Sequence, residues 1–269
     1  MNDGESAMDL GLQGTVVLIT GGSKGIGLAC ARQFSSEGAR IAIASRDPEH
    51  LRQATQALQG AGAPVLAVSA DLCDPTQASS LVRQVIDELG PIGVLVNSAG
   101  AARRTPPAEL TAQHWHAAMD AKFFPYMHAI DAVLPGMVQN GGGVIVNIVG
   151  TGGKMASPVH LPGGAANAAL MLASAGLANA YAAKGVRVNA VNPGITATSR
   201  MREGLEAEAR SSGKAIEDIL SQRVSALPMG RVAEPEEVAD MVVFLASRRA
   251  AYVNGAVLTL DGGATPIVV

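Results

Sequence analysis

A short glycine-rich segment near the N-terminus carries the clearest chemistry in the chain. An apolar run over 16–20 leads into Gly21, Gly25 and Gly27, and a helical pattern follows. Glycines at this spacing permit a tight turn and let backbone N–H groups approach a pyrophosphate, while the helix N-terminus adds partial positive charge. The segment therefore predicts a nucleotide site. The other turn residues assigned to this site are Ser23, Lys24 and Ile26.

The end of the second predicted strand bears on which dinucleotide binds. A carboxylate there accepts hydrogen bonds from the ribose of NAD, whereas Arg pairs with the 2′-phosphate of NADP. The chain has Ser45 and Arg46 at this place, and Lys24 offers a second cation. Two cations favour NADP, because Arg binds phosphate bidentately and Lys adds a point charge. Asp47 keeps NAD as the alternative, although its other interpretation is the N-cap of the helix that starts at Pro48.

Short β-branched runs alternate with longer helical patterns, which predicts a parallel sheet built from βαβ units. We expect one α/β domain over residues 1–269: a doubly wound, Rossmann-type sheet of seven parallel strands with helices on both faces. Strands are predicted at 15–20, 40–45, 64–69, 93–97, 143–149, 186–191 and 256–260, and helices at 25–37, 48–59, 76–89, 112–139, 163–184, 199–220 and 235–247.

Three segments depart from this regular alternation. Residues 1–11 are expected to form a disordered or extended tail. Pro125 lies inside the helix predicted over 112–139 and should bend it, because proline removes a backbone donor. The segment 196–225 follows a strand end, where doubly wound sheets bind their ligands. It is interpreted either as a substrate lid or as a solvated pair of surface helices.

Composition and charge argue against several classes of partner. The net charge is −3 without a basic cluster, so neither nucleic acid nor an anionic membrane surface is expected as a partner. No apolar run approaches the roughly 20 residues that span a bilayer, and the first ten residues lack the pattern of a secretory signal. Two cysteines predict reduced thiols in a cytoplasmic protein. No metal site is predicted, since His114 and His116 do not share a helical face.

Further short motifs follow the glycine turn in a fixed order. They read Asn-Ser-Ala-Gly at 97–100 and Asn-Pro-Gly-Ile-Thr at 192–196, with an Asp-Leu pair at 71–72. Together with Thr-Gly-Gly-Ser-Lys-Gly-Ile-Gly at 20–27, they resemble the NNAG, PG, adenine-contacting and TGxxxGxG motifs of the short-chain dehydrogenase/reductase family. The resemblance covers about residues 12 to 264. It implies that further residues contact the cofactor: Asp71, Leu72, Asn97, Ala99, Gly100, Pro193, Gly194, Ile195 and Thr196.

The same resemblance locates four catalytic positions, and none holds the residue that the family uses. The family has Asn, Ser, Tyr and Lys there, with Tyr as the acid or base at the substrate oxygen. Alignment of the flanking segments puts Lys122, Gly150, Gly163 and Asn167 at these positions. The chain resembles a divergent branch with a GxxGNAAL-like segment in place of YxxxK. Because Gly and Asn are not acids near neutral pH, another group must transfer the proton if the chain is an enzyme.

Three nearby side chains are candidate substitutes, and each has a plainer interpretation. Thr151 can donate a hydrogen bond, or it can be a loop hydroxyl bonded to backbone. His160 can act as an acid near neutral pH, or it can be a solvent-exposed loop histidine. Lys122 can reach Asn147 or a substrate anion, or it can form a structural ion pair. Core or interface positions are expected for Tyr126 and Tyr252.

Three functions remain open at this level. The favoured one is an NADP(H)-binding oxidoreductase with a non-standard catalytic site, acting on a carbonyl or alcohol substrate. The alternatives are a cofactor-binding sensor or scaffold without turnover, and a lyase- or isomerase-like reaction on the same fold. The resemblance also implies a homotetramer or homodimer, because the family pairs the helices predicted at 112–139 and 163–184 across a dimer.

Overall fold

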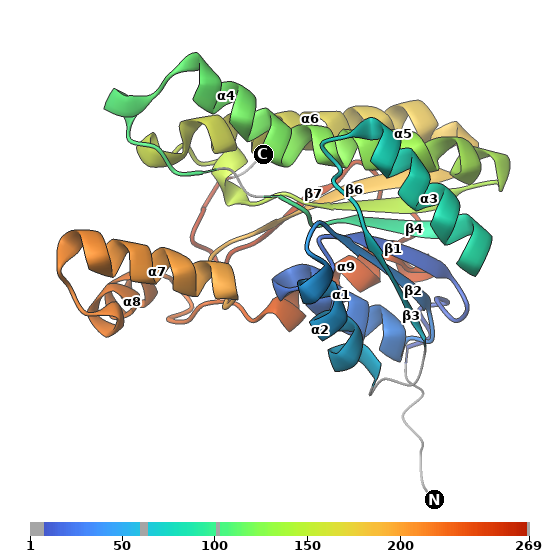
Figure 1. Ribbon diagram of the computed structural model, residues 1–269, viewed down its shortest axis with the longest axis horizontal. Coiled ribbons are helices and arrows are strands. Elements are labelled where there is room, and N and C mark those ends of the chain that lie inside the picture. Colours follow the sequence, from blue (N-terminus) through green and yellow to red (C-terminus); the bar gives the residue numbers. More distant parts are fainter. Residues whose placement is uncertain (1–7, 60–63, 101–102, 268–269) are drawn as a thin grey trace, which may run out of the picture.

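The computed structural model describes residues 8–59, 64–100 and 103–267, and seven parallel strands form its sheet (Figure 1). The strands are β1 (Val16–Thr20), β2 (Arg40–Ser45), β3 (Val65–Ser69), β4 (Ile92–Asn97), β5 (Gly143–Ile148), β6 (Val186–Pro193) and β7 (Val257–Leu260). Their order is β3-β2-β1-β4-β5-β6-β7, with parallel pairing throughout. The predicted doubly wound α/β fold is confirmed, and the strand ends shift by at most two residues.

Helices cover both faces of this sheet. The helices are α1 (Gly25–Ser36), α2 (Pro48–Leu58), α3 (Pro75–Leu89), α4 (Ala112–Ala118), α5 (Phe124–Gln139), α6 (Leu161–Tyr181), α7 (Ser199–Ser212), α8 (Ile216–Ser225) and α9 (Pro235–Ala246). Figure 1 shows α1, α2 and α9 on one face, and α3, α5 and α6 on the other. Local sequence explains several starts: Asp47 and Asp74 cap α2 and α3, and each precedes a proline at the first helical position.

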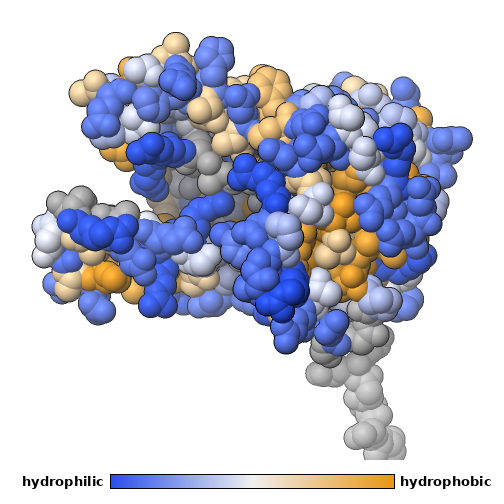
Figure 2. Space-filling model, viewed as in Figure 1, coloured by the Kyte–Doolittle hydropathy of each residue, from blue (hydrophilic) through white to orange (hydrophobic). Residues whose placement is uncertain are grey.

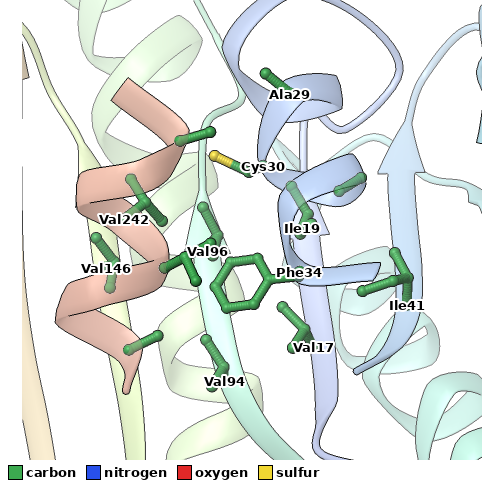
Figure 3. Close-up of a cluster of buried hydrophobic side chains, with 14 of the residues drawn as sticks. Val17, Ile19, Ala29, Cys30, Phe34, Ile41, Val94, Val96, Val146 and Val242 are labelled. Carbon is green, nitrogen blue, oxygen red and sulfur yellow. The ribbon is translucent and has the colours of Figure 1, made fainter. Parts of the chain in front are cut away.

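The sheet separates two apolar cores, one on each face, and successive residues of β1 belong to them alternately. Val17 and Ile19 belong to the core beneath α1 and α9, where the ring of Phe34 is fully buried (Figure 3). Leu18 packs on the opposite side with Ile130 of α5. A strand that is covered on both faces is apolar at consecutive positions, which accounts for the unbroken apolar run before the glycine turn.

Two helices predicted as continuous are interrupted. The segment 112–139 consists of α4, a π-helical turn at Met119–Phe123, and α5, in whose first turn Pro125 lies. The missing N–H of a proline is tolerated in a first turn, so the chain reorganises just before Pro125 instead of bending around it. The segment 199–220 is divided by Gly213, which adopts a φ of +70° and ends α7.

Helix α6 is the most apolar helix that the structure describes. With its flanking turns it spans Pro158–Lys184, long and apolar enough by length and composition to cross a membrane. Within this fold it is a core helix, because Leu170, Ser174 and Ala178 are buried against the sheet. Packing against the sheet therefore accounts for the apolar residues on its inner face.

The predicted N-terminal tail is described only from residue 8 onward. There, Arg248 and Arg249 hold the chain in place. The Arg248 guanidinium lies 3.2 Å from the Asp9 carboxylate, and the Arg249 side chain donates to the Asp9 carbonyl at 3.0 Å. This part of the tail is docked, and residues 1–7 lie outside the described residues.

Candidate active site

A cleft of about 1070 Å³ opens at the carboxyl ends of the strands. Figure 2 shows it as a hollow, open on the left between the region of α4 and that of α7 and α8. In doubly wound sheets this is where ligands bind. Fifteen residues predicted to contact a cofactor line the cleft. They are Gly21, Ser23, Lys24, Gly25, Ile26, Ser45, Arg46, Asp71, Leu72, Ala99, Gly100, Pro193, Gly194, Ile195 and Thr196.

The glycine turn has the geometry that its sequence predicts. Gly21 has a φ of +67°, and a Cβ atom there would lie 2.8 Å from the backbone of Ala99. A Cβ atom at Gly27 would collide with the carbonyl of Gly21, so this third glycine permits close packing of helix on strand. Lys24 occupies the N-cap of α1 without a capping side-chain bond. The Lys24 side chain therefore accepts no hydrogen bond from the first backbone N–H groups of α1, and these groups are left to bind a phosphate.

The adenosine end of the cleft separates Arg46 from Asp47. Ser45 and Arg46 line the cleft where β2 ends. The Asp47 carboxylate instead accepts from the N–H groups of Glu49 and His50, at 2.9 and 3.2 Å. It is therefore engaged as the N-cap of α2, in agreement with the structural interpretation of this residue.

Asn97 lies beneath the cleft, within a buried polar chain. Its side-chain oxygen accepts from Thr20 Oγ1 at 3.1 Å, and its amide donates to Asn147 Oδ1 at 3.0 Å. The Asn147 amide donates in turn to Ser174 Oγ at 2.8 Å. Each of these side chains is fully buried. The chain joins β1, β4, β5 and α6, so Asn97 fixes the strand ends that form the floor.

Two of the predicted catalytic positions, Gly150 and Asn167, face each other. Gly150 lines the cleft with a φ of +120°, and a Cβ atom there would lie 3.5 Å from the Asn167 amide nitrogen. Gly163 is buried one turn earlier in α6. None of these three residues has a side chain that is acidic or basic near neutral pH.

The fourth position holds Lys122, and here the structure places an ionisable group. Lys122 is 8% exposed, lines the cleft and lies in the π-helical turn. Its Nζ atom donates to Tyr126 Oη and to the Ile148 carbonyl, both at 3.1 Å. The Tyr126 hydroxyl is fully buried and donates to the same carbonyl at 2.6 Å. Tyr126 is thus a core residue, whereas Tyr252 is fully exposed.

Burial dominates the electrostatics of Lys122. Desolvation lowers its pKa from 10.5 to about 7, and the positive charge of Arg200 contributes in the same direction. No carboxylate pairs with Lys122 among the residues that the structure describes, and its Nζ atom makes no bond to Asn147. Of the interpretations considered for Lys122, neither the structural ion pair nor the contact with Asn147 is found among the described residues.

The two weaker candidates are placed differently. Thr151 lines the cleft in a short 3₁₀ turn, where its carbonyl accepts from the N–H groups of Lys154 and Met155. His160 is half-buried, and its Nδ1 atom is buried without a hydrogen-bond partner in the described part of the chain. Desolvation lowers the His160 pKa, and the positive charges of Arg104 and Lys122 lower it further. The ring is therefore a weak base at this place.

Sequence reasoning missed three cationic cleft residues, Arg104, Arg200 and Arg223. Arg200 belongs to the first turn of α7, within the segment considered as a lid, and its Nη1 atom donates to the Gly100 carbonyl at 3.3 Å. Thr198, the N-cap of α7, approaches the glycine turn, because a Cβ atom at Gly25 would lie 3.3 Å from its methyl group. The abundance of Arg in 196–225 was the available signal, but the sequence does not show which arginine faces the cleft.

Comparisons with known proteins agree with this architecture. Residues 21–265 match the family model described as enoyl-(acyl carrier protein) reductase. D-threitol dehydrogenase from Mycolicibacterium smegmatis is 34% identical over 257 residues, which cover 96% of this chain and 95% of that protein. L-sorbose reductase from Gluconobacter frateurii, solved with NADPH and L-sorbose, is 31% identical with a TM-score of 0.92, covering 97% of this chain and 100% of that one.

A third relative carries the other nicotinamide cofactor. A 7α-hydroxysteroid dehydrogenase complexed with NADH is 26% identical with a TM-score of 0.86, covering 95% of this chain and 96% of that one. The relatives thus include proteins solved with NADPH and with NADH. With the sheet order, the glycine turn and the position of the cleft, these matches establish that the chain belongs to the short-chain dehydrogenase/reductase family of NAD(P)-dependent oxidoreductases.

Proposed function

We propose that this protein is an NADP(H)-dependent oxidoreductase that interconverts a carbonyl and an alcohol, with Lys122 as the proton-transferring residue. The observation that carries the proposal is the buried Lys122 amine on the cleft lining, fixed by Tyr126 and the Ile148 carbonyl. In the alignment that the resemblance implies, Lys122 is an ionisable group at one of the four catalytic positions, whereas the other three hold Gly150, Gly163 and Asn167.

The residues of the cleft fit a phosphorylated dinucleotide. The glycine turn and the start of α1 would hold the pyrophosphate, while Arg46 and Lys24 would hold the 2′-phosphate. Asp71 and Leu72 would contact the adenine, and the segment 193–196 the nicotinamide amide. When bound, NADPH supplies the hydride for the carbonyl carbon.

Lys122 has the hydrogen-bond capacity that proton transfer requires. The ammonium form has three N–H groups, of which two are used by Tyr126 and Ile148, so one remains for the substrate oxygen. After donating that proton, the neutral amine retains both bonds and presents its lone pair in the vacated direction. With a pKa of about 7, both forms are populated near neutral pH, as an acid–base catalyst requires. Tyr126 acts as a positioning residue.

The first prediction concerns Lys122→Met, tested by NADPH consumption against ketones, aldehydes and quinones. We expect turnover by the parent and a loss of about 10²–10⁴-fold in the variant, the range for removal of a general acid. The rate of carbonyl reduction by the parent should fall as pH rises through about 7, because the ammonium form is lost. The rate of alcohol oxidation should rise over the same interval, and both inflections should be absent from the variant.

Lys184→Met is the matched control, since Lys184 is exposed at the far end of α6 and should leave rates and pH profiles unchanged. Equal rates for the parent and Lys122→Met would remove Lys122 from the mechanism. Tight NADPH binding without turnover of any substrate would favour the alternative of a cofactor-binding sensor or scaffold.

A further inference from the structure

The cleft is strongly positive although the chain is acidic overall. Six cationic and two acidic side chains line it, in a protein of net charge −3. Lys24 and Arg46 belong to the proposed dinucleotide half, together with Asp71. In α7 and α8, Arg223 forms an ion pair with Glu208. The remaining three cations require a separate explanation.

These three are Arg104, Lys122 and Arg200, and they come from separate segments. Arg104 precedes α4, Lys122 lies in the π-helical turn and Arg200 starts α7, and all three line the cleft. Within the described ranges 8–59, 64–100 and 103–267, no carboxylate forms an ion pair with any of them. Arg200 is instead held by a neutral acceptor, the Gly100 carbonyl.

The three residues line one cleft, where the Arg200 side chain is fixed at the Gly100 carbonyl. Arg200 lowers the pKa of Lys122, and desolvation, Arg104 and Lys122 lower the pKa of His160, so positive charge acts on both of these cleft groups. Like charges that face one cleft repel one another. An anion placed among them would relieve this repulsion, and an Arg fork matches the two oxygens of a carboxylate or phosphate.

We infer that the substrate of this site carries an oxyanion group, carboxylate or phosphate, which Arg104 and Arg200 bind while the reacting oxygen lies at Lys122. This inference rests on the proposed function, since it names the substrate class of the same cleft. The arginines act as binding residues and take no part in proton transfer.

The test compares pairs of carbonyl substrates that have similar carbon skeletons and differ in charge. We would compare 4-oxopentanoate with its methyl ester, and dihydroxyacetone phosphate with dihydroxyacetone, measuring kcat/KM with NADPH. The parent should prefer at least one charged member by about tenfold to hundredfold, the range of a charge-assisted hydrogen bond. Which pair shows the preference distinguishes carboxylate from phosphate. Arg104→Gln and Arg200→Gln should remove most of this charge preference, chiefly by raising KM for the charged member.

Two neighbouring arginines serve as controls. Arg202 lies on the same helix as Arg200 and is exposed like it, but it pairs with Glu206 and is not among the residues that line the cleft. Arg103 precedes Arg104 and is likewise exposed, but it does not line the cleft. Arg202→Gln and Arg103→Gln should keep the charge preference of the parent. NADPH affinity, measured for every variant, shows whether Arg200 acts on the dinucleotide instead, and a loss there with intact charge preference would overturn its assignment.

A binding measurement separates this inference from the proposed function. Calorimetric titration of pentanoate and of inorganic phosphate into the NADP⁺ complex requires no turnover. Binding of either anion that weakens about tenfold in both arginine variants, but not in the controls, would support the anion site even for a protein that reduces nothing. Turnover of charged and neutral members at equal kcat/KM would overturn the inference and leave the proposed function intact. Failure of both anions to bind the parent would also overturn it.

Discussion

A buried lysine without a carboxylate partner is costly for a fold, and Lys122 is such a residue. Desolvation disfavours its charged form, and no ion pair compensates among the described residues. A stability argument alone would replace it with an apolar residue of similar volume. The hydrogen bonds from Nζ to Tyr126 and to the Ile148 carbonyl instead hold the amine at the cleft in one orientation. Perturbed ionisable groups in clefts are typical of functional sites.

Arg46 is the residue on which cofactor choice should depend. Its side chain lines the cleft beyond β2, while the Asp47 carboxylate is occupied in capping α2. We therefore predict that Arg46→Ala raises the Kd for NADPH by about tenfold to hundredfold, because a charge-assisted phosphate contact is lost. The Kd for NADH, which lacks that phosphate, should change by less than about threefold. Titration of protein fluorescence with each nucleotide measures both constants.

Arg52→Ala is the control for this substitution. Arg52 lies on α2, is exposed and pairs with Glu49 at 2.6 Å, so neither nucleotide should bind more weakly to the variant. Equal losses of NADPH and NADH affinity in Arg46→Ala would contradict an NADP preference, and would return Asp47 to consideration as a ribose ligand.

At the scale of elements, the loop after β5 packs directly against α6. A Cβ atom at Gly164 would lie 2.7 Å from the Gly152 carbonyl oxygen, and one at Gly153 would lie 2.7 Å from the Ala168 nitrogen. The glycines in these two segments therefore allow backbone to approach backbone. The GxxGN-like sequence, which carries no acid or base, has a structural reason in this contact.

The backbone conformation of Gly150, at the start of this loop, makes restoration of the family's serine unfavourable. Gly150 has a φ of +120° and a ψ of +148°, a region that is almost restricted to glycine. Gly150→Ser should therefore lower the free energy of unfolding by about 1–3 kcal/mol, the cost of such backbone strain. Urea denaturation followed by circular dichroism would measure it.

Gly176→Ala, in α6, is expected to raise the free energy of unfolding, whereas Gly150→Ser should lower it. Gly176 lies on the exposed face of α6, with no atom within 4 Å of a Cβ at that position. In a single chain, alanine should stabilise the helix there by about 0.5–1 kcal/mol. The measurement is made on the monomer, because Gly176 lies one turn from Leu172 on the face of α6 that is expected to pair with a second copy. If Gly150→Ser were as stable as the parent, the loop would have to relax to a different conformation, and the assignment of backbone strain to position 150 would fail.

The sequence predicted the elements well and the interruptions poorly. Continuous apolar runs and Asp-Pro starts are local signals, so the strands and the starts of α2 and α3 agree with the structure. The π-helical turn has no comparable local signature, since Pro125 indicates a disturbance without its form. The break between α7 and α8 occurs at Gly213, whose backbone is left-handed. A helical pattern read over the whole segment does not reveal such a single residue.

The dinucleotide half and the substrate half of the cleft also differ in how well the sequence predicts them. The glycine turn encodes its own backbone geometry, and this explains why most of the predicted cofactor residues line the cleft. Arg104, Lys122 and Arg200 come from three segments far apart in the chain, and only the tertiary structure brings them together. The Lys122–Tyr126 bond could be suspected from a spacing of four, yet their shared acceptor, Ile148, belongs to another element.

For the whole molecule, the outer face of α6 bears on assembly. Leu172 is 77% exposed in the middle of this helix, and small exposed residues flank it. Trp115 on α4 and Phe124 at the start of α5 are also exposed, at 41% and 40%, on the same side of the sheet (Figure 1). Apolar side chains that gather on one side of a soluble fold are typical of an interaction surface, and we predict that α6 pairs with its symmetry mate in a homodimer or homotetramer.

Leu172→Lys tests this prediction, because it would place two like charges near a two-fold axis. Light scattering should give a mass of at least twice the chain's 27.3 kDa for the parent, and should shift toward a single chain for the variant. Met8→Lys is the control: Met8 is 64% exposed and adjoins Asp9, which Arg248 and Arg249 hold just after α9, a helix on the face of the sheet opposite α6 (Figure 1). A monomeric parent would exclude both assemblies, whereas a variant that keeps the parent's mass would move the interface to another face.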